Sequence, residues 1–308
     1  MSIWLDFLGA EIRYVETPTY GRVWIAEAGK GKPEALFLMH GIGGHIEAYS
    51  KNVVPLGKHF HTIAFDFVGH GLSEKKTDIE YPAQGYAEQL RELMDALGIE
   101  KAHLEGESLG GMVAGFFAIK YPERVGRLIL NTTGGIPIMS EKGRQDLVDL
   151  ANRTAANYGK APTYESVKDR MQWLIYEGNW HLLTDELINS RLAIYQQPDF
   201  QKSAPLVFAR LNKAKDGNTA PDMVELEKIE ADALLLWTTH NPIHDVAAAQ
   251  AALPRLKRGQ LYVMSKDAGH WPQYEWPDEH DQVVTQFLKT GTVPTASEPA
   301  ELQEAYGS

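Results

Sequence analysis

The stretch KAHLEGESLGGMVAGFFAIKYP, Lys101 to Pro122, is the strongest indication of the fold, because a strand, a tight turn and a helix follow one another in it. Its centre GESLG, Gly106 to Gly110, fits the pattern G-x-S-x-G. The glycines permit a cramped elbow, which holds the Oγ of Ser108 above the sheet near the positive N-terminus of the helix. We therefore predict that Ser108 is a nucleophile. The pentapeptide alone is common by chance, and its plainer interpretation is a glycine turn with a surface serine.

Other apolar runs along the chain have the length and pattern of strands. They are EIRYVET (11–17), RVWIAEAG (22–29), ALFLMHG (35–41), HTIAFDFVGHG (61–71), RVGRLILNTT (124–133), DALLLW (232–237) and GQLYVMS (259–265). The first two read as a hairpin, and YAEQLRELMDALGI (86–99) has the apolar spacing of an amphipathic helix. Buried strands that alternate with helices predict an α/β protein with a mostly parallel central sheet and helices on both faces.

The pattern changes between Pro137 and Ala220, where no strand-like run occurs. Helical stretches rich in Trp and Tyr stand there instead, such as YESVKDRMQWLIYEG (164–178) and DELINSRLAIYQQ (185–197). We predict a helical lid at 137–220, inserted into a core formed by 1–136 and 221–290. The remaining residues 291–308 have little to bury, which predicts a disordered tail.

Composition limits the classes of function. The 308 residues are 44% hydrophobic and 23% charged, and the formal net charge of −11 argues against a nucleic-acid partner or an anionic membrane surface. Cysteine is absent, which excludes disulfides, cysteine-bound zinc and a cysteine nucleophile. The first residues lack the segments of a signal peptide, and no stretch approaches the roughly 20 apolar residues of a membrane span. We expect a cytoplasmic protein.

A second glycine-rich turn, LMHGIGGH (38–45), follows the predicted strand at 35–41. It lets the backbone fold back toward the elbow, where the N–H groups of Ile42 and Leu109 could hold a developing oxyanion. One lost donor of this kind typically costs about 10²–10³ in kcat. The alternative is an ordinary glycine turn, and His40 is expected to be structural because it belongs to the turn itself.

The stretch AGHWPQYE (268–275) places His270 in a loop after the last predicted strand. The chain order of serine, acid and then histidine is that of one known arrangement of catalytic triads, so His270 is the predicted base for Ser108. His240 and His244 stand four residues apart but in a loop, and no third ligand accompanies them. We therefore expect no metal site.

Taken together, these motifs resemble the α/β-hydrolase superfamily over residues 11–290. HGIGG, DFVGHGLS (66–73), GESLGG and GHW occur in the order typical of that superfamily. Four stretches are similar to the meta-cleavage-product hydrolases, which split carbon–carbon bonds in ring-opened aromatic catabolites: MDALGIEKAHLEGESLGG, YPERVGRLILNTTGG, LTDELINSRLAIYQQPDF and GHWPQYE. The resemblance implies an α/β-hydrolase fold with an inserted helical lid.

The resemblance also implies roles for two pocket residues. Arg191 matches the lid arginine that holds the carboxylate of the dienoate substrate, and Trp271 matches the tryptophan beside the histidine. A guanidinium suits the first role because its planar fork binds a carboxylate bidentately and it stays charged in a partly dry cleft. The alternative for Arg191 is a solvated lid charge paired with Asp185 or Glu186, and Trp271 could equally be plain pocket wall or core.

This chain departs from the family in the polar half of the predicted pocket. Glu107 stands directly before the nucleophile, where the family usually has Asn, and we count it among the substrate-binding residues. The oxyanion loop GIGGHIEAY is also shorter, and the second polar residue of that loop has no counterpart. These changes leave the fold untouched and leave the substrate, and the carbon–carbon assignment itself, open.

The acid of the triad is replaced as well. Counting from Trp237 in LLLWTTHNPIHD (234–245), the superfamily's acid falls at Asn241. In the first interpretation, the side-chain oxygen of Asn241 accepts the Nδ1–H of His270 and fixes its tautomer, but brings no charge to stabilise the imidazolium. The corresponding Asp-to-Asn change in a serine protease costs roughly 10⁴ in kcat.

Two other interpretations remain open. A substitute carboxylate could come from Asp245, Asp267 or Glu107, although Asp245 equally suits a helix N-terminus. Alternatively, the site is crippled and the protein only binds a ligand. We favour Asn241 itself, because ketonisation of a dienol needs a positioned proton shuttle more than a strong imidazolium stabiliser.

The sequence thus predicts a serine-dependent hydrolase that needs no cofactor. The expected substrate is a small anionic molecule, a ring-opened aromatic catabolite of the 2-hydroxy-6-oxo-dienoate type, cleaved at a carbon–carbon bond. The alternatives are a carboxylesterase or amidase on a small acid derivative, a weakly catalytic ligand-binding protein, and a cofactor-free oxygenase. Family members are often dimers or tetramers, so the resemblance leaves a homo-oligomer open.

Overall fold

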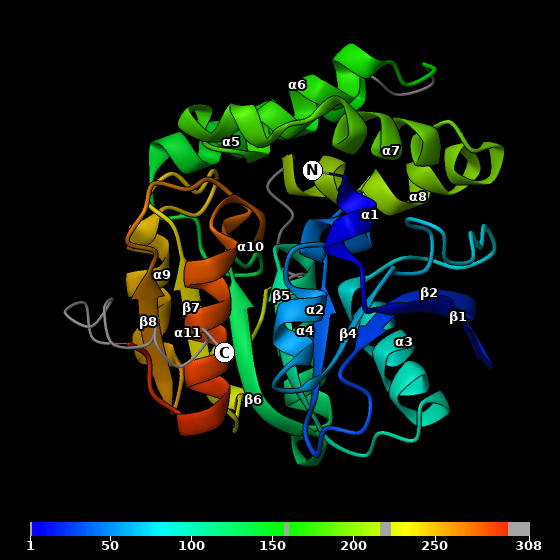
Figure 1. The fold of residues 1–308 in the computed structure, drawn as a ribbon. Helices are drawn as coiled ribbons and strands as arrows, with labels where there is room; N and C mark the ends of the chain where they lie inside the picture. The colour runs from blue at the N-terminus through cyan, green and yellow to red at the C-terminus, as the bar shows by residue number, and fades with distance from the viewer. Residues whose placement is uncertain (1, 157–159, 216–222, 295–308) are drawn as a thin grey trace.

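The computed structural model describes residues 2–156, 160–215 and 223–294, and it has one eight-stranded sheet at its centre (Figure 1). The strand order is β1-β2-β4-β3-β5-β6-β7-β8. β1 pairs antiparallel with β2, β2 pairs antiparallel with β4, and all other neighbours are parallel. The strands are β1 (Glu11–Thr17), β2 (Gly21–Ala28), β3 (Ala35–Met39), β4 (His61–Phe65), β5 (Ala102–Glu107), β6 (Val125–Asn131), β7 (Asp232–Trp237) and β8 (Gly259–Val263). Each predicted strand is confirmed, and so is the mostly parallel sheet.

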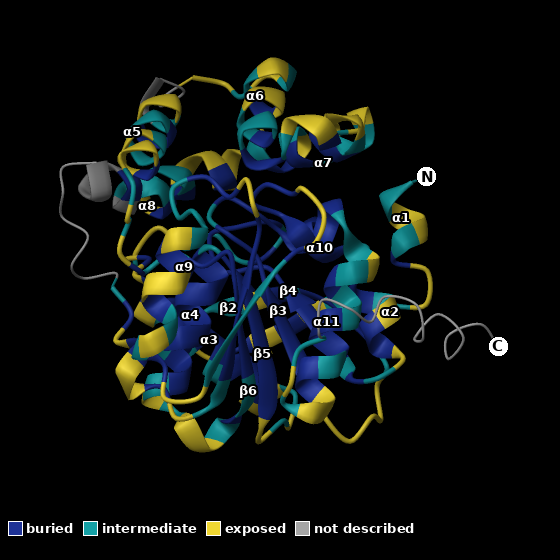
Figure 2. Ribbon diagram, turned by 90° about the vertical axis from the view of Figure 1, so that its left-hand side faces the viewer, coloured by how far each residue is buried: buried dark blue, intermediate teal, exposed yellow. Residues whose placement is uncertain are grey.

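Side chains alternate between the two faces of the sheet, as the pleat of a strand requires. In β3, Phe37 and Met39 belong to one buried cluster and Leu36 and Leu38 to the other. Figure 2 shows the central strands of the sheet, β3 among them, in the colour of buried residues, with helices on either side. The first cluster contains side chains of α3 (Ala83–Ala96), α4 (Leu109–Lys120) and α9 (Val246–Ala252), and the second contains those of α2 (Val53–Gly57), α10 (Pro272–Glu275) and α11 (Pro277–Thr290). Helices therefore cover both faces, as predicted.

Four helices between β6 and β7 lie over one end of the sheet (Figures 1 and 2). They are α5 (Glu141–Ala156), α6 (Tyr164–Leu174), α7 (Asp185–Tyr195) and α8 (Pro198–Lys215), with the 3₁₀ helix η3 (Glu177–Leu182) before α7. Thr163 and Thr184 accept hydrogen bonds from backbone N–H groups in the first turns of α6 and α7, which defines where those helices start. Parts of the predicted lid (157–159 and 216–220), two residues of the predicted core (221–222) and most of the predicted tail (295–308) fall outside the described residues.

Several short elements carry no signal that a sequence pattern could reveal. They are α1 (Ile3–Asp6), η1 (Ile46–Tyr49), η2 (Pro122–Arg124), η5 (Leu226–Lys228) and η6 (Leu253–Arg255). Helices of three or four residues complete only about one turn, so no apolar periodicity can develop in them. Within the described ranges, no helix is long and apolar enough to cross a membrane.

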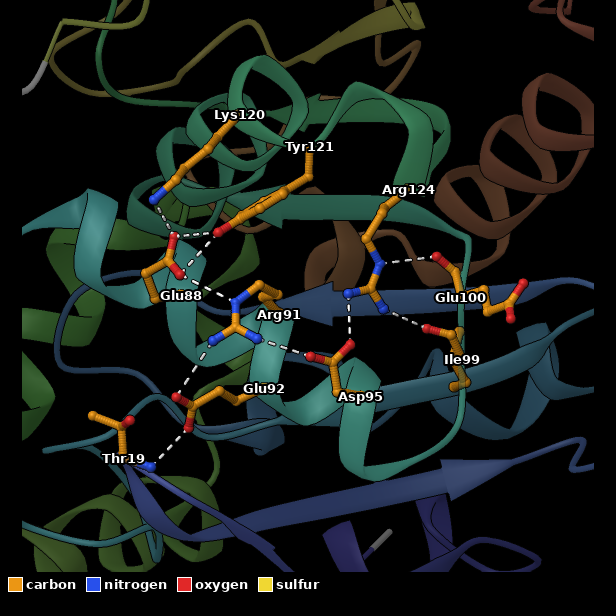
Figure 3. A network of polar contacts seen from close by, with 10 residues as sticks. All are labelled: Thr19, Glu88, Arg91, Glu92, Asp95, Ile99, Glu100, Lys120, Tyr121 and Arg124. Carbon is orange, nitrogen blue, oxygen red and sulfur yellow. Dashed lines mark hydrogen bonds and ion pairs between the residues drawn. The ribbon is translucent and has the colours of Figure 1, made fainter.

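A polar network joins α3 to the end of α4 and the turn that follows it (Figure 3). Glu88 accepts hydrogen bonds from Lys120 Nζ (2.6 Å) and from the Tyr121 hydroxyl (2.7 Å). Arg124 Nη1 lies 2.6 Å from Asp95 Oδ1. These side chains are partly exposed, so each pair contributes little to stability. The network serves the scaffold, since none of its members lines the cavity described below.

A second polar cluster, most of it fully buried, lies beneath the turn that carries Ser108. His280 on α11 contacts Glu105 of β5 (2.6 Å) and Asp281 (2.9 Å). Asn131 at the end of β6 donates to Glu105 (3.2 Å) and, through its carbonyl, accepts the N–H of Ser108 (3.1 Å). Burial alone would lower the pKa of His280, but the charges of Glu105 and Asp281 and their hydrogen bonds raise it to about 10. His280 is therefore an imidazolium, and through Glu105 and Asn131 it supports the backbone beneath Ser108.

Replacement of His280 by leucine is expected to lower the free energy of unfolding by about 3–5 kcal/mol, because Glu105 is left buried without its counter-charge. The folded pKa lies above the ordinary value of 6.5, so this stabilisation is fully present below about pH 6.5 and is lost as the pH rises through about 10. Urea unfolding from pH 6 to 10.5 measures both effects.

Arg258→Ala is the matched control, because it breaks an ion pair with Asp232 that is largely exposed. It should cost less than about 1 kcal/mol. If His280→Leu unfolded at the same urea concentration as this control, the buried pair would not stabilise the fold.

Candidate active site

Ser108 stands on a strained elbow at the end of β5. Its backbone has φ 55° and ψ −111°, a conformation that residues other than glycine rarely adopt. A Cβ at Gly106 would lie 2.1 Å from the carbonyl of Gly110, and a Cβ at Gly110 would lie 2.2 Å from the carbonyl oxygen of Met39. Only glycine fits at both positions, so the G-x-S-x-G pattern is explained by close backbone packing on either side of the serine.

Ser108 and His270 line one cavity of about 40 Å³ where the lid meets the strand ends. Gly41, Ile42 and Glu107 line it from the core, and Arg191 lines it from the lid. His270 is held in place by its backbone, whose N–H donates to Leu174 (2.6 Å) and whose carbonyl accepts from the Thr132 hydroxyl (2.9 Å). The predicted nucleophile and base therefore share one enclosed space.

Asn241 lies beside the imidazole. Its Oδ1 is 2.6 Å from His270 Nδ1, and its Nδ2 donates to the carbonyl of His244 at 2.6 Å. A carbonyl can only accept, so the amide nitrogen must face His244 and the amide oxygen must face His270. His270 Nδ1 consequently carries a hydrogen. This geometry is the one required by our first interpretation of Asn241.

Glu107 occupies the other side of the imidazole. Its Oε1 lies 3.0 Å from His270 Nε2, and its Oε2 accepts the N–H of Gly41 at 2.6 Å. The side chain is only 2% exposed. No hydrogen bond between Ser108 Oγ and His270 is seen among the described residues. In this state the Nε2 of the histidine faces a carboxylate.

The other two candidate carboxylates face elsewhere. Asp245 is the N-cap of α9, where its Oδ1 accepts the N–H of Ala248 (3.1 Å). Asp267 is 61% exposed and contacts His240 and Thr239. Of the three carboxylates weighed from the sequence, Glu107 is the one that contacts His270.

The predicted oxyanion donors are the N–H of Ile42, in the loop after β3, and the N–H of Leu109, at the elbow. Leu109 is the first residue of α4, so its N–H has no partner within the helix. The N–H of Ile42 donates to no described residue, while that of Gly41 is taken by Glu107. His40 is structural, as expected: burial lowers its pKa to about 3, and its ring bonds Gly41 and the N–H of Phe67.

Arg191 is buried and paired, contrary to the alternative of a solvated lid charge. Its Nη2 donates to Glu47 Oε1 at 2.7 Å, whereas Asp185 and Glu186 at the start of its helix are not its partners. Its guanidinium lies 5.0 Å from the ring centroid of Trp271. Trp271 is 2% exposed and lines the cavity, so it belongs to both the pocket wall and the core.

Sequence reasoning missed Arg170 on α6. Its Nη2 donates to the carbonyl of Ile42 (3.2 Å), while its Nε is buried and has no hydrogen-bond partner among the described residues. No described carboxylate lies within ion-pair distance of it. The helical pattern of the lid indicated only that this arginine is on a helix, because the facing loop comes from a distant part of the chain.

Arg170 also lines a second cavity of about 310 Å³ inside the lid. Leu150 and Trp173 belong to both cavities, so the two spaces adjoin at these side chains. The walls of the lid cavity are largely apolar, including Val167, Phe200 and Phe208. The lid thus offers the larger space, and the strand ends offer the reactive groups.

Glu275 was also missed, and it ties the histidine loop to the lid. One carboxylate oxygen accepts the N–H groups of Gly269 (2.9 Å) and Trp271 (3.3 Å), and the other accepts from Tyr176 (3.1 Å) and Asn179 (2.8 Å). Burial raises the pKa of Glu275 to about 7, despite these hydrogen bonds. The loop that carries His270 is therefore held by a buried carboxylate.

A serine on a strand-to-helix elbow, an adjoining glycine-rich loop and a histidine from a late loop are the arrangement of the α/β-hydrolase class of enzymes. Residues 34–277 match the family model of the alpha/beta hydrolase fold, so the chain belongs to this family. It is a hydrolase by class.

The chain is similar to named members of the family along most of its length. It is 32% identical over 273 residues to the 2-hydroxy-6-oxo-6-phenylhexa-2,4-dienoate hydrolase of Comamonas testosteroni, covering 85% of this chain and 90% of that protein. It is 31% identical over 280 residues to the 2-hydroxy-6-oxononadienedioate/2-hydroxy-6-oxononatrienedioate hydrolase of the same species, covering 88% and 92%. These relatives confirm the resemblance to the meta-cleavage-product hydrolases.

A solved structure shows the shared fold. The 2-hydroxy-6-oxo-6-phenylhexa-2,4-dienoate hydrolase of Rhodococcus sp. strain RHA1 superposes with a TM-score of 0.73 over 91% of this chain and 99% of that chain, at 22% identity.

Proposed function

We propose that this protein hydrolyses a carbon–carbon bond in a ring-opened aromatic catabolite of the 2-hydroxy-6-oxo-dienoate type, without a cofactor. The observation that carries the proposal is the common cavity of Ser108 and His270, in a chain whose named relatives act on such dienoates. The adjoining lid cavity of about 310 Å³, with its apolar walls, suits the part of the substrate beyond the reacting ketone.

The chemistry needs a proton shuttle and two successive nucleophiles, Ser108 and water. Ketonisation takes the proton from the 2-hydroxyl and places one on carbon 5, so that the neighbouring C6 carbonyl becomes an ordinary ketone. Ser108 Oγ attacks C6, and the N–H groups of Ile42 and Leu109 hold the oxyanion. The C5–C6 bond then breaks with its electrons on the dienol fragment, and water releases the acid from the serine. His270 carries the protons, and Asn241 holds its tautomer.

The substrate carboxylate needs a cationic partner, and two arginines are candidates. Family resemblance favours Arg191, whose charge here is already matched by Glu47. Arg170 has unused hydrogen-bonding capacity and lies at the junction of the two cavities. A hydrogen bond to a charged group contributes about 1.5–3 kcal/mol, which corresponds to roughly 10–150-fold in affinity.

Arg170→Gln is therefore expected to raise KM for an anionic dienoate by roughly 10–150-fold, with little effect on a neutral aryl ester. Steady-state kinetics on both substrates measures this difference. Arg144→Gln, an exposed lid arginine paired with Glu141, is the matched control and should change neither KM. An equal loss on both substrates would show that Arg170 acts on the fold of the lid rather than on the carboxylate.

A spectrophotometric screen tests the proposed function directly. Yellow ring-fission products are offered to the protein, and bleaching is followed with Ser108→Ala as the blank. The proposal expects bleaching that depends on Ser108. Hydrolysis of aryl esters without any bleaching would instead identify a carboxylesterase, and a serine that a fluorophosphonate probe does not label would identify a ligand-binding protein.

A further inference from the structure

The two residues beside the His270 ring differ from those that the family resemblance implies. An amide, Asn241, stands at the position of the acid, and an acid, Glu107, stands where the family usually has Asn. Asn241 lies 2.6 Å from His270 Nδ1, and Glu107 lies 3.0 Å from His270 Nε2. The loop after β7 thus places no carboxylate against the His270 ring, whereas the residue before Ser108 does. Both residues contact the same ring from opposite sides.

The hydrogen-bond pattern determines how many protons the pair holds. Because Asn241 donates to the carbonyl of His244, its oxygen faces the imidazole and Nδ1 carries a hydrogen. Nε2 and Glu107 Oε1 are both acceptors when unprotonated, so a contact of 3.0 Å requires one proton between them. His270 and Glu107 therefore share a proton in the resting site.

Burial makes this sharing strong. The side chains of Glu107 and His270 are 2% and 9% exposed, and an unpaired carboxylate so deeply buried would be costly. The Gly41 N–H supports the other carboxylate oxygen at 2.6 Å. Other charged or titratable groups lie near the pair. Arg170 on α6 and Tyr49 on η1 interact with Glu107, His244 after β7 interacts with His270, and Arg191 on α7 lines the same cavity.

We infer that Glu107 is the carboxylate partner of the catalytic histidine, acting at Nε2 instead of at Nδ1. The substrate in this inference rests on the proposed function, whereas the proton exchange between Glu107 and His270 does not depend on which substrate is bound. When Glu107 takes the shared proton, the Nε2 lone pair becomes free to accept the proton of Ser108 or of a substrate hydroxyl. Nε2 then passes that proton to carbon 5 of the substrate or to the departing dienolate while Glu107 keeps its own, so the pair ends each cycle with the same number of protons.

Four proteins test the inference: the natural chain, Glu107→Gln, Asn241→Asp, and the double variant Glu107→Gln with Asn241→Asp. Glu107→Gln should lower kcat by about 10²–10³-fold, within the range of general acid–base contributions. The double variant should recover at least about tenfold of this loss, because the carboxylate returns to the ring at Nδ1.

Asp267→Asn is the control, because this carboxylate belongs to the same loop as His270 but contacts His240 and Thr239 instead. Its kcat should match that of the natural chain. Circular dichroism and urea unfolding confirm that each variant is folded. A folded Glu107→Gln with natural kcat, or a folded double variant no faster than Glu107→Gln, would overturn the inference.

Three reactions are measured, so that a wrong substrate assignment can be distinguished from a wrong role of Glu107. Ring-fission products report carbon–carbon cleavage, a p-nitrophenyl ester reports acyl transfer, and a fluorophosphonate reports the reactivity of Ser108 itself. If ring-fission products are untouched, the loss and recovery must still be seen with the ester or the probe. A natural protein that is inert in all three would contradict both proposals.

Discussion

Ser108→Ala is expected to reduce turnover by roughly 10⁴–10⁶-fold, a loss typical of removing the nucleophile of a serine hydrolase. Alanine keeps the Cβ and therefore the elbow, so the fold and the cavity should persist. Fluorophosphonate labelling should disappear at the same time. Stopped-flow measurement with a ring-fission product would then show binding without bleaching.

The backbone of Ser108 adds a second, independent expectation. The φ of 55° is strained for any residue with a Cβ and ordinary for glycine. Ser108→Gly should therefore be as inactive as Ser108→Ala but more stable by about 1 kcal/mol or more, measured by urea unfolding. Equal stability of the two variants would mean that the elbow stores no strain. Substantial turnover in either variant would remove Ser108 from the mechanism.

Asn241→Ala is the second change with a large expected effect, a loss of about 10²–10⁴-fold in kcat. The imidazole would lose the acceptor that holds its Nδ1–H, and the wrong tautomer leaves Nε2 unable to accept a proton. The carbonyl of His244 would also lose a donor, which should cost roughly 1–3 kcal/mol of stability.

Asp245→Ala is the matched control for Asn241, because Asp245 lies in the same loop but caps α9. It should cost about 0.5–2 kcal/mol of stability and leave kcat unchanged. Natural turnover in Asn241→Ala together with abolished turnover in Asp245→Ala would show that the supporting residue had been misassigned.

The strands and the elbow were predictable because their signals are local. Apolar runs such as 35–41 and 232–237 differ from helical stretches in period and length, and the glycines around Ser108 mark the turn. The same reasoning found the lid helices that contain 164–174 and 185–195. It did not find α1 or η1, which are too short to show a period, nor did it assign α11 after the histidine loop.

The partners of the site residues were much less predictable. Arg191 was expected either to bind substrate or to pair within its own helix, and it pairs with Glu47 from the other half of the chain. Arg170 stood out in no motif. Glu107 was weighed both as a pocket residue and as a substitute acid, and spacing offered no reason to prefer one.

The α/β sheet, the strained serine and the order of serine, amide and histidine follow from the amino-acid sequence, because period, glycine positions and chain order are properties of the sequence itself. The contact of Glu107 with His270 and the position of Arg170 between two cavities follow from the three-dimensional fold. Such contacts join residues from distant strand ends and lid helices, and their geometry depends on how the sheet twists and how the lid packs over it. The spacing of residues along the chain does not determine those distances.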